Sequence, residues 1–226
     1  MTGYATVGYF ESLRSIPVNH LLLALILVAV YFVGNFNPAI TLGKARGIDI
    51  RSEGSGNAGT TNALRTMGKK AAAITFAVDV LKGFLPAALT LHFFGLAYAM
   101  LCGLAVMLGH MWPALYELKG GKGVATTFGV LLAVDPILAL ILIAIVLLTV
   151  AAVRMVSAGV ILAAVAAIPV SHFFHPWYPG WILFVAALIV IKHLGNIKRI
   201  LNGSESKIRF GGKEKKNSDS DGSKRG

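Results

Sequence analysis

The residues best suited to chemistry lie in three polar segments that are separated by long apolar stretches. The first segment, Gly54–Arg65, reads Gly-Ser-Gly-Asn-Ala-Gly-Thr-Thr-Asn-Ala-Leu-Arg. Its glycines allow several backbone N–H groups to turn toward one point, its polar side chains add neutral donors, and Arg65 adds a planar charged fork. This composition is typical of an anion-binding nest. The residues expected to contact phosphate here are Gly54, Ser55, Gly56, Asn57, Gly59, Thr61, Asn62 and Arg65.

The second segment, Lys119–Gly123, reads Lys-Gly-Gly-Lys-Gly and comes directly before an apolar stretch that is expected to be helical. A phosphate group at this position is expected to use the N–H groups of the helix N-terminus together with the charge of Lys122. The expected contacts are Gly120, Gly121, Lys122 and Gly123.

The third segment, His193–Arg199, lies at the inner end of the last apolar stretch. His193 and Asn196 are three positions apart, so a continuing helix places both on one face. A single histidine or cation at a membrane border is more often an interfacial anchor than a site residue. The prediction of a phosphate site therefore depends on the coincidence that three distant segments suit anions and fall on the same side of the membrane.

Membrane-spanning helices must position these segments. Of the 226 residues, 56% are hydrophobic and only 14% are charged, whereas a soluble domain has about 25% charged residues. A crossing helix needs about 20 apolar residues, so we predict an all-α integral membrane protein of about seven transmembrane helices. The predicted spans are 18–34, 71–93, 96–116, 123–134, 136–153, 155–173 and 177–194. Residues 1–210 are expected to form one domain, and residues 211–226 a disordered polar and basic tail.

The positive charges predict the orientation of these spans. The net charge is +11, and nearly all Lys and Arg residues lie in 35–70, in 117–122, at Arg154 or from Lys192 onward. Under the positive-inside rule these parts are cytosolic, the N-terminus is outside and the C-terminus is inside. The stretch 123–134 is short for a span, but a re-entrant segment there would place the basic tail outside, so we expect a short or tilted fourth span.

Several other site classes are disfavoured by the sequence. Gly54–Gly59 fits G-x-G-x-x-G, but no strand precedes it, and Thr60 stands where a Walker loop needs lysine. No Asp-rich or His/Cys cluster offers a metal site, the only cysteine is Cys102, and we expect no nucleic-acid partner. This also disfavours phosphate or nucleotide-sugar transferases, which need Asp-rich Mg²⁺ sites. None of the six histidines has Asp five residues later, which excludes the H-x-x-x-x-D glycerol acyltransferases.

Two patterns leave alternatives open. Gly34–Thr41 contains one Asn-Pro-Ala sequence, which resembles the signature of aquaporin channels, although those have two copies and a Pro beside an Asn is ordinary where a chain leaves a span. A channel or transporter for glycerol-like or phosphorylated solutes is therefore the alternative function. Asp79 and Lys82 lie three positions apart inside a predicted span, as a buried ion pair or as functional groups.

From about Tyr31 to Lys207 the chain resembles the membrane-bound acyl-phosphate:glycerol-3-phosphate acyltransferases. Thr60 stands where this family usually has alanine, and Asn35–Pro38 replaces a more usual Gly-Ser-x-Pro. The matching motifs, in this order along the chain, are Gly47–Arg51, Gly54–Arg65, Gly68–Lys70, Asp79–Gly83, Gly109–Pro113, Lys119–Thr126, His193, Asn196, Gly203 and Glu205.

The resemblance implies transfer of a fatty acyl group from acyl phosphate to the 1-hydroxyl of sn-glycerol 3-phosphate, giving lysophosphatidic acid and phosphate. This is the first acylation step of phospholipid biosynthesis, at the cytosolic side of the bacterial cytoplasmic (inner) membrane. Membrane lipids and a soluble acyl-phosphate synthase are the further partners implied, and no cofactor or metal is. Acyl phosphate has a good leaving group, so direct attack without a covalent enzyme intermediate is expected to need only positioning, electrostatic support and modest base help.

For this reaction we assign roles to residues of the three segments as a hypothesis. Ser55, Arg65 and Lys122 are expected to hold the phosphate groups. His193 and Asn196 are expected to orient glycerol 3-phosphate, with either His193 or a substrate phosphate as the base. Glu205 is expected to hold the third segment through Lys or Arg contacts.

Overall fold

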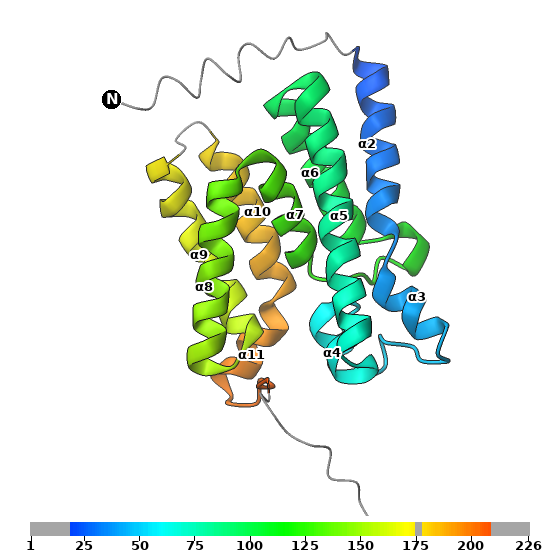
Figure 1. Ribbon diagram of the computed structural model, residues 1–226, viewed down its shortest axis with the longest axis vertical. Helices are drawn as coiled ribbons and strands as arrows, with labels where there is room; N and C mark the ends of the chain where they lie inside the picture. The colour runs from blue at the N-terminus through cyan, green and yellow to red at the C-terminus, as the bar shows by residue number, and fades with distance from the viewer. Residues whose placement is uncertain (1–18, 175–177, 209–226) are drawn as a thin grey trace, which may run out of the picture.

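The structure is a computed structural model that describes residues 19–174 and 178–208. This part of the chain contains helices and no strand, which confirms the all-helical prediction for the described residues (Figure 1). The helices are α2 (His20–Asn35), α3 (Pro38–Lys44), α4 (Thr60–Met67), α5 (Lys69–Phe94), α6 (Leu96–Met111), the 3₁₀ turn η1 (Ala114–Tyr116), α7 (Val124–Val134), α8 (Pro136–Val153), α9 (Val156–Phe174), α10 (Pro179–Lys192) and α11 (Leu194–Leu201). The predicted tail, 211–226, lies outside the described residues.

Each of the seven predicted apolar stretches coincides for most of its length with one α-helix, but the helices differ in length. Four of them, α5, α6 with the turn after it, α8 and α9, are long and apolar enough to cross a membrane. The count rises to six if each bent pair, α2 with α3 and α10 with α11, is one span. Helix α7 has 11 residues, fewer than the about 20 that a crossing needs. The count of seven spans and the orientation of the termini therefore stay predictions.

Small residues allow the helices to approach closely. Gly34 of α2 packs on the backbone of Val106 and Gly109 in α6, and Gly83 of α5 packs on the backbone of Thr126 in α7. A side chain at either glycine would collide with the facing backbone. Close contact through glycine is common between helices in lipid, where van der Waals packing replaces the hydrophobic effect as the driving force. The second of these contacts places α7 directly against α5.

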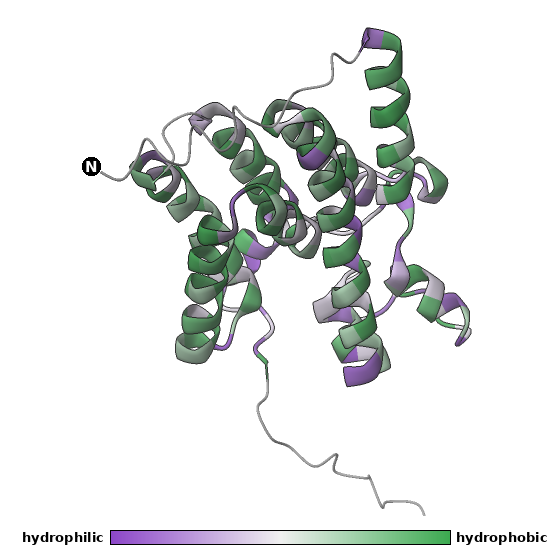
Figure 2. Cartoon of the chain, turned by 45° about the horizontal axis from the view of Figure 1, so that its top comes forward, coloured by the Kyte–Doolittle hydropathy of each residue, from purple (hydrophilic) through white to green (hydrophobic). Residues whose placement is uncertain are grey.

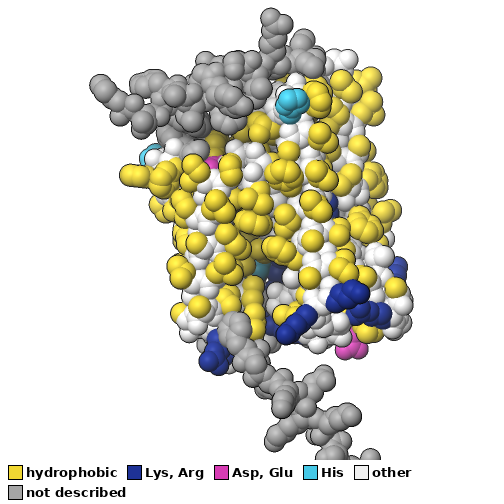
Figure 3. All heavy atoms as spheres, in the orientation of Figure 1, with side chains coloured by type: hydrophobic (Ala, Val, Ile, Leu, Met, Phe, Trp, Pro, Cys, Tyr) yellow, Lys and Arg dark blue, Asp and Glu magenta, His cyan; other side chains and the backbone are white. Residues whose placement is uncertain are grey.

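The outer surface is apolar around the middle of the molecule and basic at one end. Large apolar side chains are exposed on this surface, among them Leu148 and Phe173. In Figure 3 such side chains form a broad band, and Lys and Arg side chains gather at the end that carries α4 and α11. Figure 2 shows the hydrophilic residues mostly in the connections and at helix ends. This distribution suits a protein whose helices are surrounded by lipid.

Candidate active site

The second polar segment turns into α7 through a glycine. Gly123 has a φ of 78°, a left-handed conformation that favours glycine, and no side chain caps the helix that follows. The first N–H groups of α7 therefore have no side-chain partner at the helix start. Lys122 is half-buried next to this turn, and its amine donates a hydrogen bond to the side-chain oxygen of Asn196. The second and third segments thus meet at Lys122.

The third segment is held by a buried carboxylate. One oxygen of Glu205 accepts hydrogen bonds from Ser157 Oγ of α9 at 2.6 Å and from Asn196 Nδ2 at 2.7 Å. Its other oxygen accepts a bond from Arg199 Nε at 2.7 Å. Because Asn196 donates to Glu205, its oxygen is turned toward Lys122. Glu205 therefore fixes the orientation of the Asn196 amide, whose oxygen in turn holds the amine of Lys122.

The pKa values of these two charged groups reflect their surroundings. Burial lowers the pKa of Lys122, Glu205 opposes this, and the neighbouring cations Arg199, Arg65 and Lys192 lower it further, so that the pKa is about 8. Burial raises the pKa of Glu205, but the hydrogen bonds from Ser157, Asn196 and Arg199 outweigh it and hold the pKa below 4.5. At neutral pH the site therefore contains a charged amine next to a carboxylate that is already fully paired.

His193 lies at the bend between α10 and α11 and is 3% exposed. Its Nδ1 is 2.7 Å from the backbone oxygen of Ile189. A carbonyl oxygen only accepts, so Nδ1 carries the proton, and Nε2 of the neutral ring is the unprotonated nitrogen. The ring therefore presents an acceptor rather than a donor at Nε2.

In the first segment, the side-chain amide of Asn62 organises the loop. Its oxygen accepts from the backbone N–H of Ser55 at 2.9 Å, and its nitrogen donates to the backbone oxygens of Ile50 at 3.0 Å and Glu53 at 2.9 Å. Asn62 is fully buried, whereas the side chains of Ser55 and Arg65 are exposed. Asn62 thus shapes the loop, and Ser55 and Arg65 are left facing outward.

The other predicted contacts of the first segment surround this amide. Gly54 and Gly56 have φ values of 60° and 70° and are exposed at the loop tip, and Gly59 is the residue before α4. Asn57 and Thr61 are half-buried beside that helix start. The hydroxyl of Thr60 is buried without a hydrogen-bond partner among the described residues.

The first and second segments touch at Gly121. Asn37, in the break between α2 and α3, donates from Nδ2 to the backbone oxygen of Ala58 at 3.0 Å. A methyl group built on Gly121 would overlap the ring of His110 and lie 3.0 Å from that same Ala58 oxygen. The contact between Ala58 and Gly121 therefore joins the first segment to the second, and the hydrogen bond between Lys122 and Asn196 joins the second to the third. No hydrogen bond links Ser55 or Arg65 to the other two segments within the described residues.

The Asn-Pro-Ala sequence has structural contacts in this arrangement. The oxygen of Asn37 accepts from Ile40 N at 3.0 Å and caps α3. The oxygen of Asn35 accepts from Leu115 N at 3.1 Å, which ties η1 to the end of α2. Both asparagines are buried. They hold the loops next to the site.

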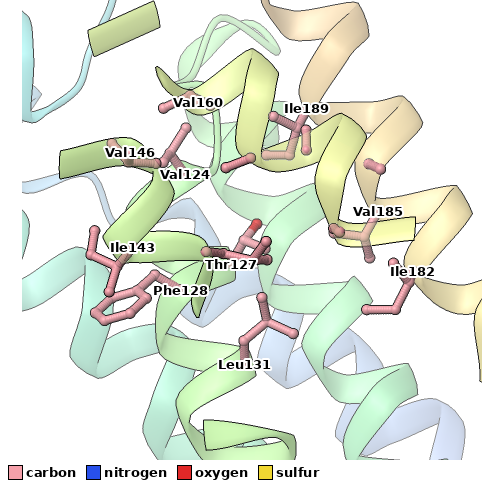
Figure 4. Close-up of a pocket in the computed structure, with 15 residues that line it drawn as sticks. Val124, Thr127, Phe128, Leu131, Ile143, Val146, Val160, Ile182, Val185 and Ile189 are labelled. Atoms are coloured by element: carbon pink, nitrogen blue, oxygen red, sulfur yellow. The ribbon is translucent and has the colours of Figure 1, made fainter. Parts of the chain in front are cut away.

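An apolar pocket lies directly beside these polar groups. It is formed by α7, α8, α9 and α10 (Figure 4). One end is lined by Val124, two residues after Lys122, and by Ile189, whose carbonyl holds His193. Thr127 also lines the pocket, and its hydroxyl is buried without a hydrogen-bond partner in the described part of the chain. The polar site thus continues into an apolar space.

Some of these residues were not predicted as site residues. His110, Thr127 and Ser157 lie in apolar helices, and their sequence positions do not indicate which loop they face. The predicted ion pair of Asp79 and Lys82 is present, with Nζ 2.8 Å from Oδ1. Among the residues that the structure describes, no group of three or more His, Cys, Asp or Glu side chains is arranged to hold a metal ion.

Comparison with known proteins identifies the family. Residues 24–203 match the glycerol-3-phosphate acyltransferase family. The chain belongs to this family. It is 42% identical over 190 residues to the glycerol-3-phosphate acyltransferase of Alkaliphilus metalliredigens, covering 81% of this chain and 95% of the relative. It is 38% identical over 192 residues to that of Bacillus subtilis, covering 84% and 100%.

Two solved structures are similar to this acyltransferase. Both are crystal structures of PlsY (YgiH), described as an integral membrane glycerol 3-phosphate acyltransferase. The glycerol 3-phosphate form has a TM-score of 0.80 and 35% identity, and covers 83% of this chain and 96% of that chain. The lysophosphatidic acid form has a TM-score of 0.76 and 34% identity, and covers 83% and 95%. The chain is therefore a membrane-embedded enzyme, and the predicted family is confirmed.

Proposed function

We propose that this acyltransferase moves a fatty acyl group from an acyl phosphate to the 1-hydroxyl of sn-glycerol 3-phosphate. The observation that carries the proposal is the meeting of three anion-suited segments at the end of an apolar pocket. The relatives are named for glycerol 3-phosphate, and the solved neighbours contain it and lysophosphatidic acid. Acyl phosphate combines a second phosphate group with a long apolar chain, which matches the two kinds of surface at this site.

The site supplies separate groups for two phosphates. Exposed Ser55, in the loop before α4, and exposed Arg65, in the last turn of that helix, form one anion-binding surface, and Lys122 beside the N-terminus of α7 forms the other. His193 and Asn196 lie next to Lys122 and orient glycerol 3-phosphate. Fixed donors of this kind act mainly by positioning both substrates and by stabilising the charge that develops during transfer.

The apolar pocket receives the acyl chain. Its end at Val124 and Ile189 lies next to the polar groups, and Figure 4 shows Leu131 and Ile182 farther along the pocket. A fatty chain in this space is withdrawn from water while its carbonyl stays near Lys122. The hydroxyl of Thr127, which has no hydrogen-bond partner among the described residues, offers that carbonyl, or the phosphate next to it, a hydrogen-bond donor.

The reaction is a direct substitution at the acyl carbon. The glycerol oxygen forms an ester bond, the bond from the acyl carbon to the phosphate oxygen breaks, and the hydroxyl proton passes to a base. His193 can accept this proton at Nε2, and a substrate phosphate oxygen is the other candidate. Inorganic phosphate leaves, and lysophosphatidic acid remains at the lipid boundary. No covalent enzyme intermediate is needed.

The proposal includes the setting of the enzyme. Residues 1–210 form one membrane domain in the bacterial cytoplasmic (inner) membrane, and the three polar segments face the cytosol. The basic residues at this end support that orientation. From this side the site meets soluble glycerol 3-phosphate and an acyl phosphate made by a soluble synthase.

The experiment that tests this proposal compares two acyl donors. Purified protein in detergent is given glycerol 3-phosphate with either palmitoyl phosphate or palmitoyl-CoA, and lysophosphatidic acid and phosphate are measured. We expect product from palmitoyl phosphate, with one phosphate released per ester formed. Product from palmitoyl-CoA alone would contradict the proposed donor.

A further inference from the structure

A buried group of three ionisable side chains lies between α5 and α6, outside the proposed reaction. Lys82 Nζ is 2.8 Å from Asp79 Oδ1 and 2.8 Å from His110 Nδ1, and His110 Nδ1 is 3.4 Å from Asp79 Oδ1. The side chains of Lys82, Asp79 and His110 are 5%, 2% and 4% exposed. Ionisable groups are costly in this environment, so a cluster of three is a candidate for a specific role.

Lys82 also holds the break between α2 and α3. Its amine donates to the backbone oxygens of Gly34 at 3.2 Å and Phe36 at 2.6 Å. Carbonyls at the end of a helix lack partners within the helix, and here the lysine of a neighbouring helix supplies one. The two helices are bent by 42° at this break. The cluster thus fixes the start of the segment that carries Asn37.

His110 faces the second phosphate-binding segment. An ammonium group only donates, so His110 Nδ1 accepts from Lys82, and Nε2 carries the ring proton. A side chain at Gly121 would overlap this Nε2, and Gly121 N donates to the backbone oxygen of His110 at 3.1 Å. Both the ring and the backbone of His110 therefore support Gly121, next to Lys122.

Two chains of contacts start at Lys82 and connect it to the first and second segments. One chain, or arm, runs through Phe36 and Asn37 to the backbone oxygen of Ala58 in the first segment. The other arm runs through His110 to Gly121 in the second segment. The two arms meet where Gly121 lies beside Ala58. The cluster therefore fixes how the first and second segments are placed relative to each other.

We propose that Lys82, with Asp79 and His110, is a positioning group that sets the spacing between the two phosphate-binding surfaces. It acts through Ala58 and Gly121 and touches neither substrate. This inference rests on the proposed function, because the spacing matters only if both segments bind phosphate. An ion pair that served stability alone would not need contacts that lead both to Ala58 in the first segment and to Gly121 in the second.

The first test removes both charges together. The double variant Asp79→Asn/Lys82→Met leaves no buried charge unpaired, and it is compared with the wild type in kcat and KM for glycerol 3-phosphate and in thermal unfolding. We expect KM for glycerol 3-phosphate to rise about tenfold or more, because displaced hydrogen-bond donors bind its phosphate group less well. Tyr178→Phe is the control, because it removes a buried hydroxyl bonded to Asp135, which lies at the end of α7 opposite to Lys122. It is expected to lower stability with KM unchanged.

The second test separates the two arms at His110. His110→Asn keeps an acceptor near Lys82 but removes the ring edge beside Gly121, whereas His110→Leu removes both. We expect KM to rise in both variants and the unfolding temperature to fall clearly only in His110→Leu. If KM stays at the wild-type value in His110→Asn and in any double variant that folds, the positioning role is wrong. Wild-type protein that forms no lysophosphatidic acid would instead overturn the proposed function itself.

Discussion

The amine of Lys122 donates a hydrogen bond to the side-chain oxygen of Asn196, 74 positions later in the chain. Glu205 takes the other end of that amide at 2.7 Å, so the oxygen of Asn196 has to face the lysine. These hydrogen bonds place a charged amine beside the uncapped start of α7 and next to the end of the apolar pocket that Val124 lines.

The first prediction concerns pH. Burial and nearby cations lower the pKa of Lys122 to about 8, so its amine is charged below that pH and neutral above it. A phosphate ester is dianionic above pH about 6. We therefore expect kcat/KM for glycerol 3-phosphate to fall as pH rises through about 8, because kcat/KM reports the free enzyme. The bound dianion favours the charged amine, so the same decline in kcat is expected at higher pH.

Lys122→Arg is the matched control, because a guanidinium stays charged throughout this range. The variant should lose the decline near pH 8 while it retains measurable activity. An unchanged alkaline limb in Lys122→Arg would mean that another group is titrating.

The second prediction concerns Glu205. Glu205→Gln keeps the shape of the side chain but turns a donor toward groups that donate to it, so we expect a loss of about 1–3 kcal/mol in the free energy of unfolding. The pKa of the wild-type carboxyl is below 4.5, so its ionisation stabilises the fold above that pH, and this contribution is lost as pH falls through the folded pKa. Unfolding temperatures of both proteins between pH 7 and about 4 provide the measurement. A difference between them that does not shrink toward low pH would contradict this account.

The third prediction concerns Gly121. A methyl group there overlaps the ring of His110 and crowds Ala58, so Gly121→Ala should displace Lys122 and lower kcat/KM by roughly 10- to 100-fold. Gly180→Ala is the control, since a methyl group at Gly180 meets nothing within 4 Å. Steady-state kinetics and unfolding temperatures distinguish a local effect from loss of the fold. Equal kinetics in the two variants would show that the loop does not depend on this contact.

The fourth prediction concerns the acyl chain. Ala167 lines the pocket seven residues along α9 from Val160, about 10 Å at 1.5 Å per residue. Ala167→Phe should fill the deep end, so activity with palmitoyl phosphate falls while activity with octanoyl phosphate is retained. Val165→Phe lies on the same helix at a position that is 57% exposed and should leave both activities unchanged. If the acyl chain binds elsewhere, Ala167→Phe and Val165→Phe will show the same activities with the two acyl phosphates.

The sequence was sufficient for the parts of the site that depend on local composition. The glycine-rich segments and the ion pair of Asp79 with Lys82 follow from residue type and spacing. The two loop contacts that join the segments, Ala58 with Gly121 and Lys122 with Asn196, depend on how helices pack over long sequence separations. Residue types alone do not indicate such pairs.

Asn62 and His110 illustrate the same limit. An asparagine in a polar loop suggests a phosphate donor, but here its amide is used by three backbone groups. A histidine in an apolar helix suggests an interfacial residue, but its ring lies beside Gly121. The number of spans is also hard to predict, because α7 is apolar along its length yet has only 11 residues.

The most direct test of the central claim compares two lysines of one loop. Lys122 is half-buried and bonded to Asn196, whereas the Lys119 side chain is 70% exposed and pairs with Glu117 at 3.0 Å. Lysophosphatidic acid formation from palmitoyl phosphate and glycerol 3-phosphate is measured in Lys122→Met and Lys119→Met. We expect a loss of roughly 10- to 100-fold in Lys122→Met, from a missing charged hydrogen bond, and near wild-type activity in Lys119→Met. Full activity in a folded Lys122→Met protein would contradict the account.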